Sequence, residues 1–232
     1  MLSIWSGLSC LPPKPRRRAS RRPAPPPKQS AGRPPAAPLP ETPMPSGPNQ
    51  PADARQPPLA VLAKIRLLLL DCDGVLTDGG VTWTEDGIEQ KTFNIRDGLG
   101  IKLWQRAGGQ VGIVTGRSSR VVAWRARELG IDFVRQGVGD KLAVVADLLA
   151  ACGLDWQAVA YVGDDLPDLP VVSRVGLGVA VADACPELCA AAGLVTRLRG
   201  GRGAVRELIE QLLKARGCWD DLIASYRGDG IA

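Results

Sequence analysis

The sequence predicts an α/β fold with a mainly parallel sheet and helices on both faces. Short apolar runs bounded by turn residues alternate along the chain with segments of helical periodicity. The helical segments are long enough to connect parallel strands through right-handed crossovers. Polar residues gather just after several of the apolar runs, at the sheet edge where folds of this class bind ligands.

The first predicted strand covers the apolar run 65–70, which ends at Asp71. A short, continuous apolar run bounded by a turn is typical of a buried parallel strand. A β-hairpin is predicted next, because β-branched and aromatic residues in 81–84 and 88–93 flank the turn 85–87, Glu-Asp-Gly.

Strands and helices alternate in the rest of the chain. Further strands are expected where apolar β-formers cluster. They cover 110–114, 131–134, 159–162, 175–181 and a short segment beginning at Val195. Helices are expected where apolar residues recur every three or four positions. They cover 99–107, 118–129, 142–152 and 205–213. Gly130 is expected to end the second of these helices.

The first 60 residues differ in composition from the rest of the 232-residue chain. They hold 17 of the 20 prolines, and nine Lys and Arg against two Asp and Glu, or +7. The remainder carries 20 basic and 22 acidic side chains, or −2, so the net charge of +5 belongs to this segment. A Pro- and Arg-rich stretch buries too little apolar surface to offset its ordering entropy. We therefore expect residues 1–58 to be disordered and residues 59–232 to form one domain.

The residue counts exclude several kinds of chemistry. The chain contains no His, which excludes a Ser-His-Asp triad, a Cys-His dyad and a His-ligated zinc site. The six Cys form no CxxC pair and fit a reduced compartment. The apolar runs are far shorter than the ~20 residues that a membrane span needs, and no secretory signal is evident. We expect a cytoplasmic protein that works through carboxylates, hydroxyls, thiols or an oxygen-bound metal.

Four segments place polar residues at one edge of the predicted sheet. These residues are Asp71 and Asp73 after the first strand; Thr115, Gly116 and Arg117 after the second; Lys141 at the start of the helix that follows the third; and Asp164, Asp165 and Asp168 after the fourth. Each group alone is typical of a turn or a helix cap. Their common placement favours a single site.

Together these side chains can bind a metal ion and an anionic group. Clustered carboxylates repel one another unless a cation lies between them, and oxygen-only ligands favour Mg²⁺. A lysine, an arginine, a hydroxyl and helix N-terminal amides complete an anion-binding site. One carboxylate can attack phosphorus and another can protonate the leaving oxygen. Phosphoester hydrolysis therefore needs no histidine here.

With these motifs, the chain resembles the haloacid dehalogenase (HAD) superfamily of phosphatases over roughly residues 60–220. Segments 73–79, 93–101 and 200–207 narrow the resemblance to phosphatases of 3-deoxy-D-manno-octulosonate 8-phosphate (Kdo 8-phosphate). The resemblance implies a Rossmann-like HAD fold with a hairpin after the first motif and no cap domain. It also implies Mg²⁺-dependent hydrolysis of Kdo 8-phosphate through an aspartyl-phosphate, in lipopolysaccharide precursor synthesis.

The resemblance assigns a role to each strand-end residue. Asp71 is implied as the nucleophile, and Asp73 as the general acid and base. Mg²⁺ would be held by Asp71, by the backbone carbonyl of Asp73 and by Asp164, with Asp165 and Asp168 supporting the site from behind. The transferring phosphoryl group would be held by Thr115, Gly116 and Lys141. Arg117 would reach the phosphate or the sugar-acid carboxylate.

The resemblance also bears on assembly. Relatives without a cap form homotetramers in which hairpins meet at the centre and a neighbouring chain covers each site. Arg96 and Arg202 are then candidates for substrate contact, and the glycines at 200–203 fit a mobile closing segment or a plain turn. The chain departs from the family pattern at Cys72, where relatives often carry an aliphatic residue, and at Cys185, where they often carry His.

Other functions share parts of this pattern. A nonulosonate 9-phosphate phosphatase, or the phosphatase-like module linked to acylneuraminate cytidylylation, carries the same motifs. A catalytically silent scaffold is disfavoured because Asp71, Asp73 and Asp164 are all present. Nucleic-acid binding through residues 14–33 is disfavoured because Trp5 is the only aromatic residue near these basic side chains. We expect no membrane partner.

Overall fold

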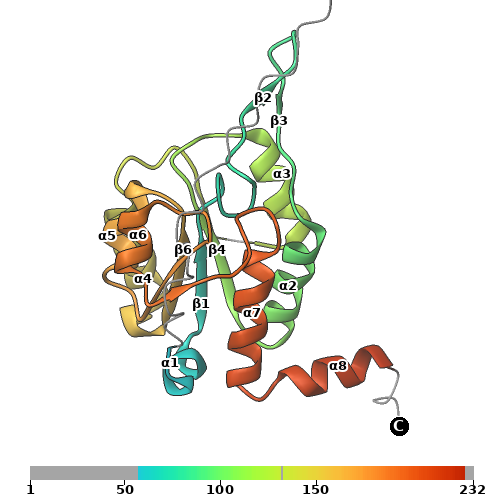
Figure 1. The fold of residues 1–232 in the computed structure, drawn as a ribbon, viewed down its shortest axis with the longest axis vertical. Coiled ribbons are helices and arrows are strands. Elements are labelled where there is room, and N and C mark those ends of the chain that lie inside the picture. The colour runs from blue at the N-terminus through green and yellow to red at the C-terminus, as the bar shows by residue number, and fades with distance from the viewer. Residues whose placement is uncertain (1–56, 132, 228–232) are drawn as a thin grey trace, which may run out of the picture. The chain divides into compact units, whose positions relative to one another are not determined.

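The computed structural model describes residues 57–131 and 133–227 (Figure 1). Its centre is a six-stranded parallel sheet in the order β5-β4-β1-β6-β7-β8. The strands are β1 (Leu67–Leu70), β4 (Gln110–Val114), β5 (Phe133–Arg135), β6 (Val159–Gly163), β7 (Leu177–Ala180) and β8 (Leu194–Val195). This arrangement confirms the predicted fold class. The prediction for residues 1–58 lies outside the described residues, apart from Pro57 and Pro58.

Alternate side chains of β1 pack into two separate layers of the core. Leu68 and Leu70 join the layer formed by α1 (Leu59–Lys64), α2 (Ile95–Arg106), α3 (Arg120–Leu129) and α7 (Ala204–Ala215). Leu67 and Leu69 join the layer formed by α4 (Lys141–Cys152), α5 (Leu169–Val172) and α6 (Pro186–Ala191). Because both faces of β1 are covered, its sequence is four consecutive leucines and shows no alternation.

The predicted hairpin is present but short. β2 (Thr82–Trp83) pairs antiparallel with β3 (Glu89–Gln90), and Gly87 takes the left-handed backbone that the turn requires. Figure 1 shows the hairpin projecting beyond the carboxyl ends of the strands. Within the described residues, only this hairpin lies between β1 and α2, and only α3 and β5 lie between Thr115 and Lys141. The chain therefore has no cap domain in these two places.

Helix boundaries follow local capping. α2 begins four residues before the predicted start, because the Asn94 side chain accepts a hydrogen bond from Arg96 N. α3 ends at Gly130 in the left-handed conformation, as predicted. The structure contains four short helices and two 3₁₀ turns that the helical pattern of the sequence does not predict. These are α1, α5, α6, α8 (Trp219–Arg227), η1 (Trp156–Ala158) and η2 (Leu166–Asp168).

None of the described helices has the length and apolar character that crossing a bilayer demands.

Candidate active site

The strand order places three loops around one point. β1 pairs with β4 on one side and with β6 on the other. After β1 the chain first adds strands on the β4 side and then returns to add strands on the β6 side, so the strand order reverses at β1. The carboxyl ends of strands at such a switch point form a natural crevice. Asp71 follows β1, Thr115 follows β4 and Asp164 follows β6, so three of the predicted residues meet there.

Three carboxylates form the centre of this crevice. One oxygen each from Asp71, Asp164 and Asp168 lies within 4.8 Å of the other two. Asp71 and Asp168 are buried and Asp164 is partly buried. Gly74 makes this approach possible, because a Cβ at that position would overlap the Asp164 carboxylate.

Lys141 lies against this carboxylate cluster from the start of α4. Its Nζ is 3.0 Å from Asp71 Oδ1 and 2.6 Å from Asp168 Oδ1. The helix start is fixed by Asp140, whose side chain accepts a hydrogen bond from Ala143 N. Burial opposes the charge of Lys141, but attraction to Asp71 and Asp168 leaves its pKa above the ordinary value. Lys141 is therefore a charged, immobilised group beside the proposed nucleophile.

Asp168 is held by four donors. Besides Lys141, it accepts hydrogen bonds from Tyr161 Oη at 2.7 Å, from Asp164 N at 3.0 Å and from Asp165 N at 3.4 Å. Burial and the Asp168 charge raise the pKa of Tyr161 well above its usual value, so the phenol keeps its proton and donates. Asp165 caps η2 instead of entering the crevice, because its carboxylate accepts from Leu166 N.

Burial and mutual repulsion perturb the two remaining carboxylates. Burial, and then the Asp168 charge, raise the pKa of Asp71 to about 6. Burial, and then the Asp71 charge, raise the pKa of Asp164 to about 8. Since the Asp168 oxygens are already engaged, Asp71 and Asp164 are the carboxylates available to a cation. A hard divalent cation such as Mg²⁺ fits this oxygen-only pair and would relieve the repulsion.

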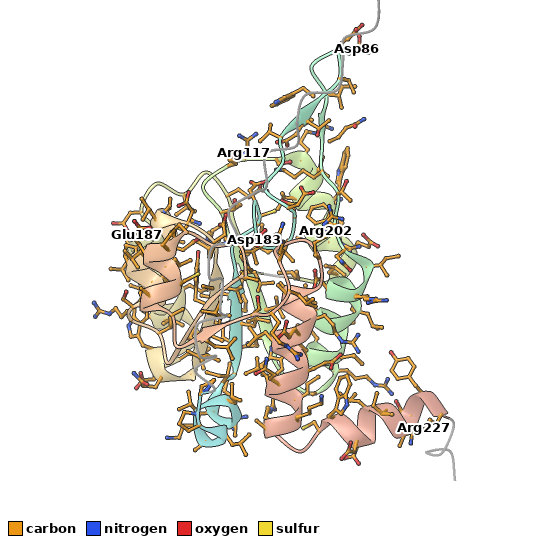
Figure 2. All side chains as sticks on the ribbon, in the orientation of Figure 1. Asp86, Arg117, Asp183, Glu187, Arg202 and Arg227 are labelled. Atoms are coloured by element: carbon orange, nitrogen blue, oxygen red, sulfur yellow. The ribbon has the colours of Figure 1, made fainter. Side chains whose placement is uncertain are left out.

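Asp73 faces a different group of charges, at the base of the hairpin. Its Oδ1 is paired with Lys91 Nζ, and its Oδ2 lies 3.8 Å from Arg117 Nε. Arg117 donates a 2.9 Å hydrogen bond to Glu89 Oε1, which is also 3.5 Å from Lys91 Nζ. Figure 2 shows Arg117 at the hairpin base, with Asp86 at the hairpin tip. Asp73 is thus set apart from the three grouped carboxylates.

The other predicted binding residues divide into two sets. Thr115 is buried, its backbone fixed by hydrogen bonds with Arg135 O and Val138 N, and the exposed Gly116 follows it. Arg96 and Arg202 instead line a cavity of about 490 Å³ on the side of α2 and α7. Neither belongs to the carboxylate cluster, and Arg202 pairs with Asp78 at 3.2 Å.

The glycine segment before α7 packs against the loop that carries Asp73. Gly201 N donates to Val75 O at 2.9 Å, and Gly200 N donates to Asp183 Oδ1 at 3.0 Å. Asn94 Nδ2 donates to Gly201 O at 3.3 Å. In this structure the segment is held by hydrogen bonds against the neighbouring loops. This arrangement fits a plain turn better than a mobile closing segment.

Sequence reasoning missed Lys91, Glu89 and Tyr161. Glu89 and Lys91 are two positions apart in the predicted strand 88–93, so the sequence spacing indicates that both can face the same side. Tyr161 lies in an apolar run that predicts a core strand, and only its hydroxyl, which needs a partner when buried, indicates a polar contact.

The sequence is similar to a known family of hydrolases and to phosphatases within it. A family model described as haloacid dehalogenase-like hydrolase matches residues 119–208. The 3-deoxy-D-manno-octulosonate 8-phosphate phosphatase KdsC of Escherichia coli (strain K12) is 48% identical over 163 residues, which cover 70% of this chain and 87% of that protein. KdsC of Salmonella typhi is 49% identical over 157 residues, which cover 68% and 84%.

The chain is also similar to solved structures of 3-deoxy-D-manno-octulosonate 8-phosphate phosphatases. The Moraxella catarrhalis 3-deoxy-D-manno-octulosonate 8-phosphate phosphatase, in complex with magnesium, phosphate and KDO, superposes with a TM-score of 0.71 at 40% identity. That match covers 72% of this chain and 97% of the other. The phosphatase of the same name from Yersinia pestis gives a TM-score of 0.69 at 46% identity, over 70% and 88%.

Proposed function

Since the chain belongs to the 3-deoxy-D-manno-octulosonate 8-phosphate phosphatase family of haloacid dehalogenase-like hydrolases, we propose that it hydrolyses Kdo 8-phosphate to Kdo and phosphate. The observation that carries the proposal is the cluster of Asp71, Asp164 and Asp168 at the switch point of the sheet, with Lys141 paired to Asp71 and Asp168.

In this proposal, Asp71 is the nucleophile. One carboxylate oxygen forms a bond to phosphorus as the bond between phosphorus and the sugar oxygen breaks, which gives an aspartyl-phosphate. The ion pair between Lys141 and Asp71 supports this role, because it aims the carboxylate and offers positive charge to the phosphoryl oxygens. Thr115, Gly116 and Arg117 would complete the phosphoryl site from the end of β4.

Asp73 would transfer the protons. It would give a proton to the departing sugar oxygen in the first step and take one from the attacking water in the second. Its separation from the carboxylate cluster supports this division of labour, since the acid must face the leaving group and not the incoming nucleophile.

Asp71 and Asp164 would hold Mg²⁺, together with the backbone carbonyl of Asp73. When bound, the ion would neutralise negative charge on the carboxylates and the phosphoryl group. Asp168 would keep Lys141 and the loop around Asp164 in place, because its oxygens accept from both. Asp165 would contribute by capping η2.

We further propose that the protein acts as a homotetramer. The hairpin exposes Val81, Trp83 and Ile88, of which Trp83 is 57% and Ile88 61% exposed. Apolar side chains at a projecting tip favour burial against copies of the same hairpin. A neighbouring chain would then cover the open site, with Arg96 and Arg202 as candidate contacts for the substrate carboxylate. The enzyme would act in the cytoplasm, in lipopolysaccharide precursor synthesis.

A substrate panel tests the proposal. Phosphate release is measured with Kdo 8-phosphate, a nonulosonate 9-phosphate and simple hexose phosphates, with Mg²⁺ and with EDTA. We expect Kdo 8-phosphate to give the highest kcat/KM, with activity only in Mg²⁺. The Asp71→Asn variant should have no measurable turnover. A preference for the nine-carbon substrate would refute the substrate assignment, and unchanged turnover in Asp71→Asn would refute the nucleophile.

A further inference from the structure

Lys91 is a buried cation outside the motifs that define the family. It follows β3, and its side chain is only 1% exposed. Burying an ammonium group is unfavourable unless it is paired and hydrogen-bonded. Lys91 meets this need with Asp73, 18 residues earlier in the chain, and with Glu89, two residues earlier on β3. The hairpin is thereby joined to the proposed proton donor.

The two oxygens of Asp73 have different surroundings. Oδ1 accepts a hydrogen bond from Lys91 Nζ. Oδ2 is buried and, within the described residues, accepts no hydrogen bond. Arg117 Nε is 3.8 Å from Oδ2, too far for a hydrogen bond, and Arg117 donates instead to Glu89. One oxygen is therefore fixed and the other is left available.

We propose that Lys91 is a positioning residue that anchors Asp73 by Oδ1, so that Oδ2 is the oxygen that transfers the proton. The proposal rests on the proposed phosphatase function. As the bond between phosphorus and the ester oxygen breaks and the bond to Asp71 forms, the proton on Asp73 Oδ2 moves to the departing alkoxide. The product alcohol leaves with that proton, and Asp73 is left as a carboxylate held by Lys91.

This role differs from two simpler ones. A purely structural Lys91 would hold the hairpin, and its loss would lower stability and affect all substrates alike. A substrate-binding Lys91 would contact the sugar, and its loss would affect only the sugar phosphate. A positioning Lys91 matters wherever the leaving group needs a proton, because only those reactions depend on the acid.

The test compares ethyl phosphate, acetyl phosphate and Kdo 8-phosphate. Ethyl and acetyl phosphate are nearly the same size, but acetate leaves without protonation and ethoxide does not. The measured quantity is kcat/KM, which reports steps up to departure of the leaving group and excludes hydrolysis of the aspartyl-phosphate. In Lys91→Met we expect kcat/KM to fall on the order of 10²-fold for ethyl phosphate and Kdo 8-phosphate, and by less than about 3-fold for acetyl phosphate.

Controls separate positioning from damage to the fold. Lys91→Arg should recover part of the loss, since a guanidinium can still hold Oδ1. Lys91→Gln is the second variant if Lys91→Met does not fold. Lys102→Met, at an exposed lysine on α2, should match the wild type for all three substrates.

Each outcome decides the proposal. Equal losses for ethyl and acetyl phosphate overturn it in favour of a structural role, and a loss confined to Kdo 8-phosphate overturns it in favour of sugar binding. If the wild type cleaves ethyl and acetyl phosphate but not Kdo 8-phosphate, the proposed substrate is wrong. The ethyl and acetyl comparison still decides the role of Lys91 in that case.

Discussion

Lys141 donates a 2.6 Å hydrogen bond to Asp168, whose side chain is 1% exposed and lies at the centre of the crevice. The same carboxylate accepts from Tyr161 and from the backbone of the loop that carries Asp164. Asp168 therefore links the lysine that we propose holds the phosphoryl group to the loop that we propose binds Mg²⁺, and its own oxygens are already engaged.

The first prediction concerns Asp168→Asn. An amide offers one acceptor oxygen where two oxygens now face four donors, so its NH₂ group must point at a donor. We expect the apparent affinity for Mg²⁺ or the kcat to fall about 10–100-fold. Activity titrations against Mg²⁺ measure this. The exposed Asp147→Asn on α4 is the matched control. An unchanged Mg²⁺ titration together with an unchanged kcat would contradict the role of Asp168.

The second prediction links Mg²⁺ to pH. The pKa values of Asp71 and Asp164, about 6 and about 8, lie above those of the unfolded chain. The metal-free fold therefore binds more protons than the unfolded chain between roughly pH 4 and 8, and loses stability from these groups as the pH rises. At pH 6 Mg²⁺ must displace a proton from Asp164, whereas at pH 8.5 it relieves repulsion between two ionised groups.

We therefore expect Mg²⁺ to raise the Tm more at pH 8.5 than at pH 6. Paired melting curves with Mg²⁺ and with EDTA at each pH cancel the titration of distant groups. In Asp164→Asn the dependence on pH should be smaller, because the group with the higher pKa is gone. Equal Mg²⁺-induced shifts at both pH values would show that the two carboxylates do not titrate in this range.

The third prediction concerns Gly200→Ala. A Cβ at Gly200 would overlap the carbonyl of Gly74, in the loop that positions Asp73 and admits Asp164. Overpacking of this kind costs about 1–3 kcal/mol, and a shift of the loop by ~1 Å lowers the rate on the order of 10²-fold. The control is Gly139→Ala, where an added methyl meets nothing within 4 Å. The Tm and kcat/KM are measured for both variants. If Gly200→Ala has the same Tm and kcat/KM as Gly139→Ala, the glycine segment 200–203 does not support the loop.

Much of the site follows from one sequence rule. Asp71, Thr115 and Asp164 each come just after an apolar run, and parallel strands must bring such positions to one edge. This rule needs no knowledge of which strands are neighbours. The fold class follows from the same alternation of apolar runs and helical segments.

Contacts made by side chains from distant segments do not follow from that rule. Lys91 reaches Asp73 only because the hairpin folds back over the end of β1, and Arg202 meets Asp78 across 124 positions of sequence. The short helices α5 and α6 are set by packing against the sheet, since four to six residues are too few to show a helical period. Tertiary packing decides these features.

The fourth prediction concerns the hairpin surface. In the double variant Trp83→Ser with Ile88→Ser, each chain loses two apolar side chains that would be buried in a tetramer. Burial of each is worth about 1.5–3 kcal/mol, so the dissociation constant should rise at least about 10²-fold. Light scattering should show smaller species, and kcat/KM for Kdo 8-phosphate should fall with them. The control is Leu59→Ser. Leu59 is an exposed leucine on α1, and α1 lies at the opposite end of the sheet from the hairpin (Figure 1). A monomeric wild type would remove the proposal that a neighbour covers the site.

The fifth prediction places the start of the catalytic domain at Leu59. α1 begins there, and Leu62 and Ile65 are buried in the core beside α7. Deleting residues 1–58 removes the Pro58 carbonyl that accepts hydrogen bonds from Val61 N and Leu62 N, but none of this buried apolar packing. Turnover should therefore match the full chain, and the Tm should stay close to it. Deleting residues 1–65 removes both side chains, each worth about 1.5–3 kcal/mol, and should lower the Tm by about 10 °C. If the shorter deletion abolishes turnover, the basic extension takes part in catalysis. If the longer deletion leaves the Tm unchanged, α1 is not part of the folded core.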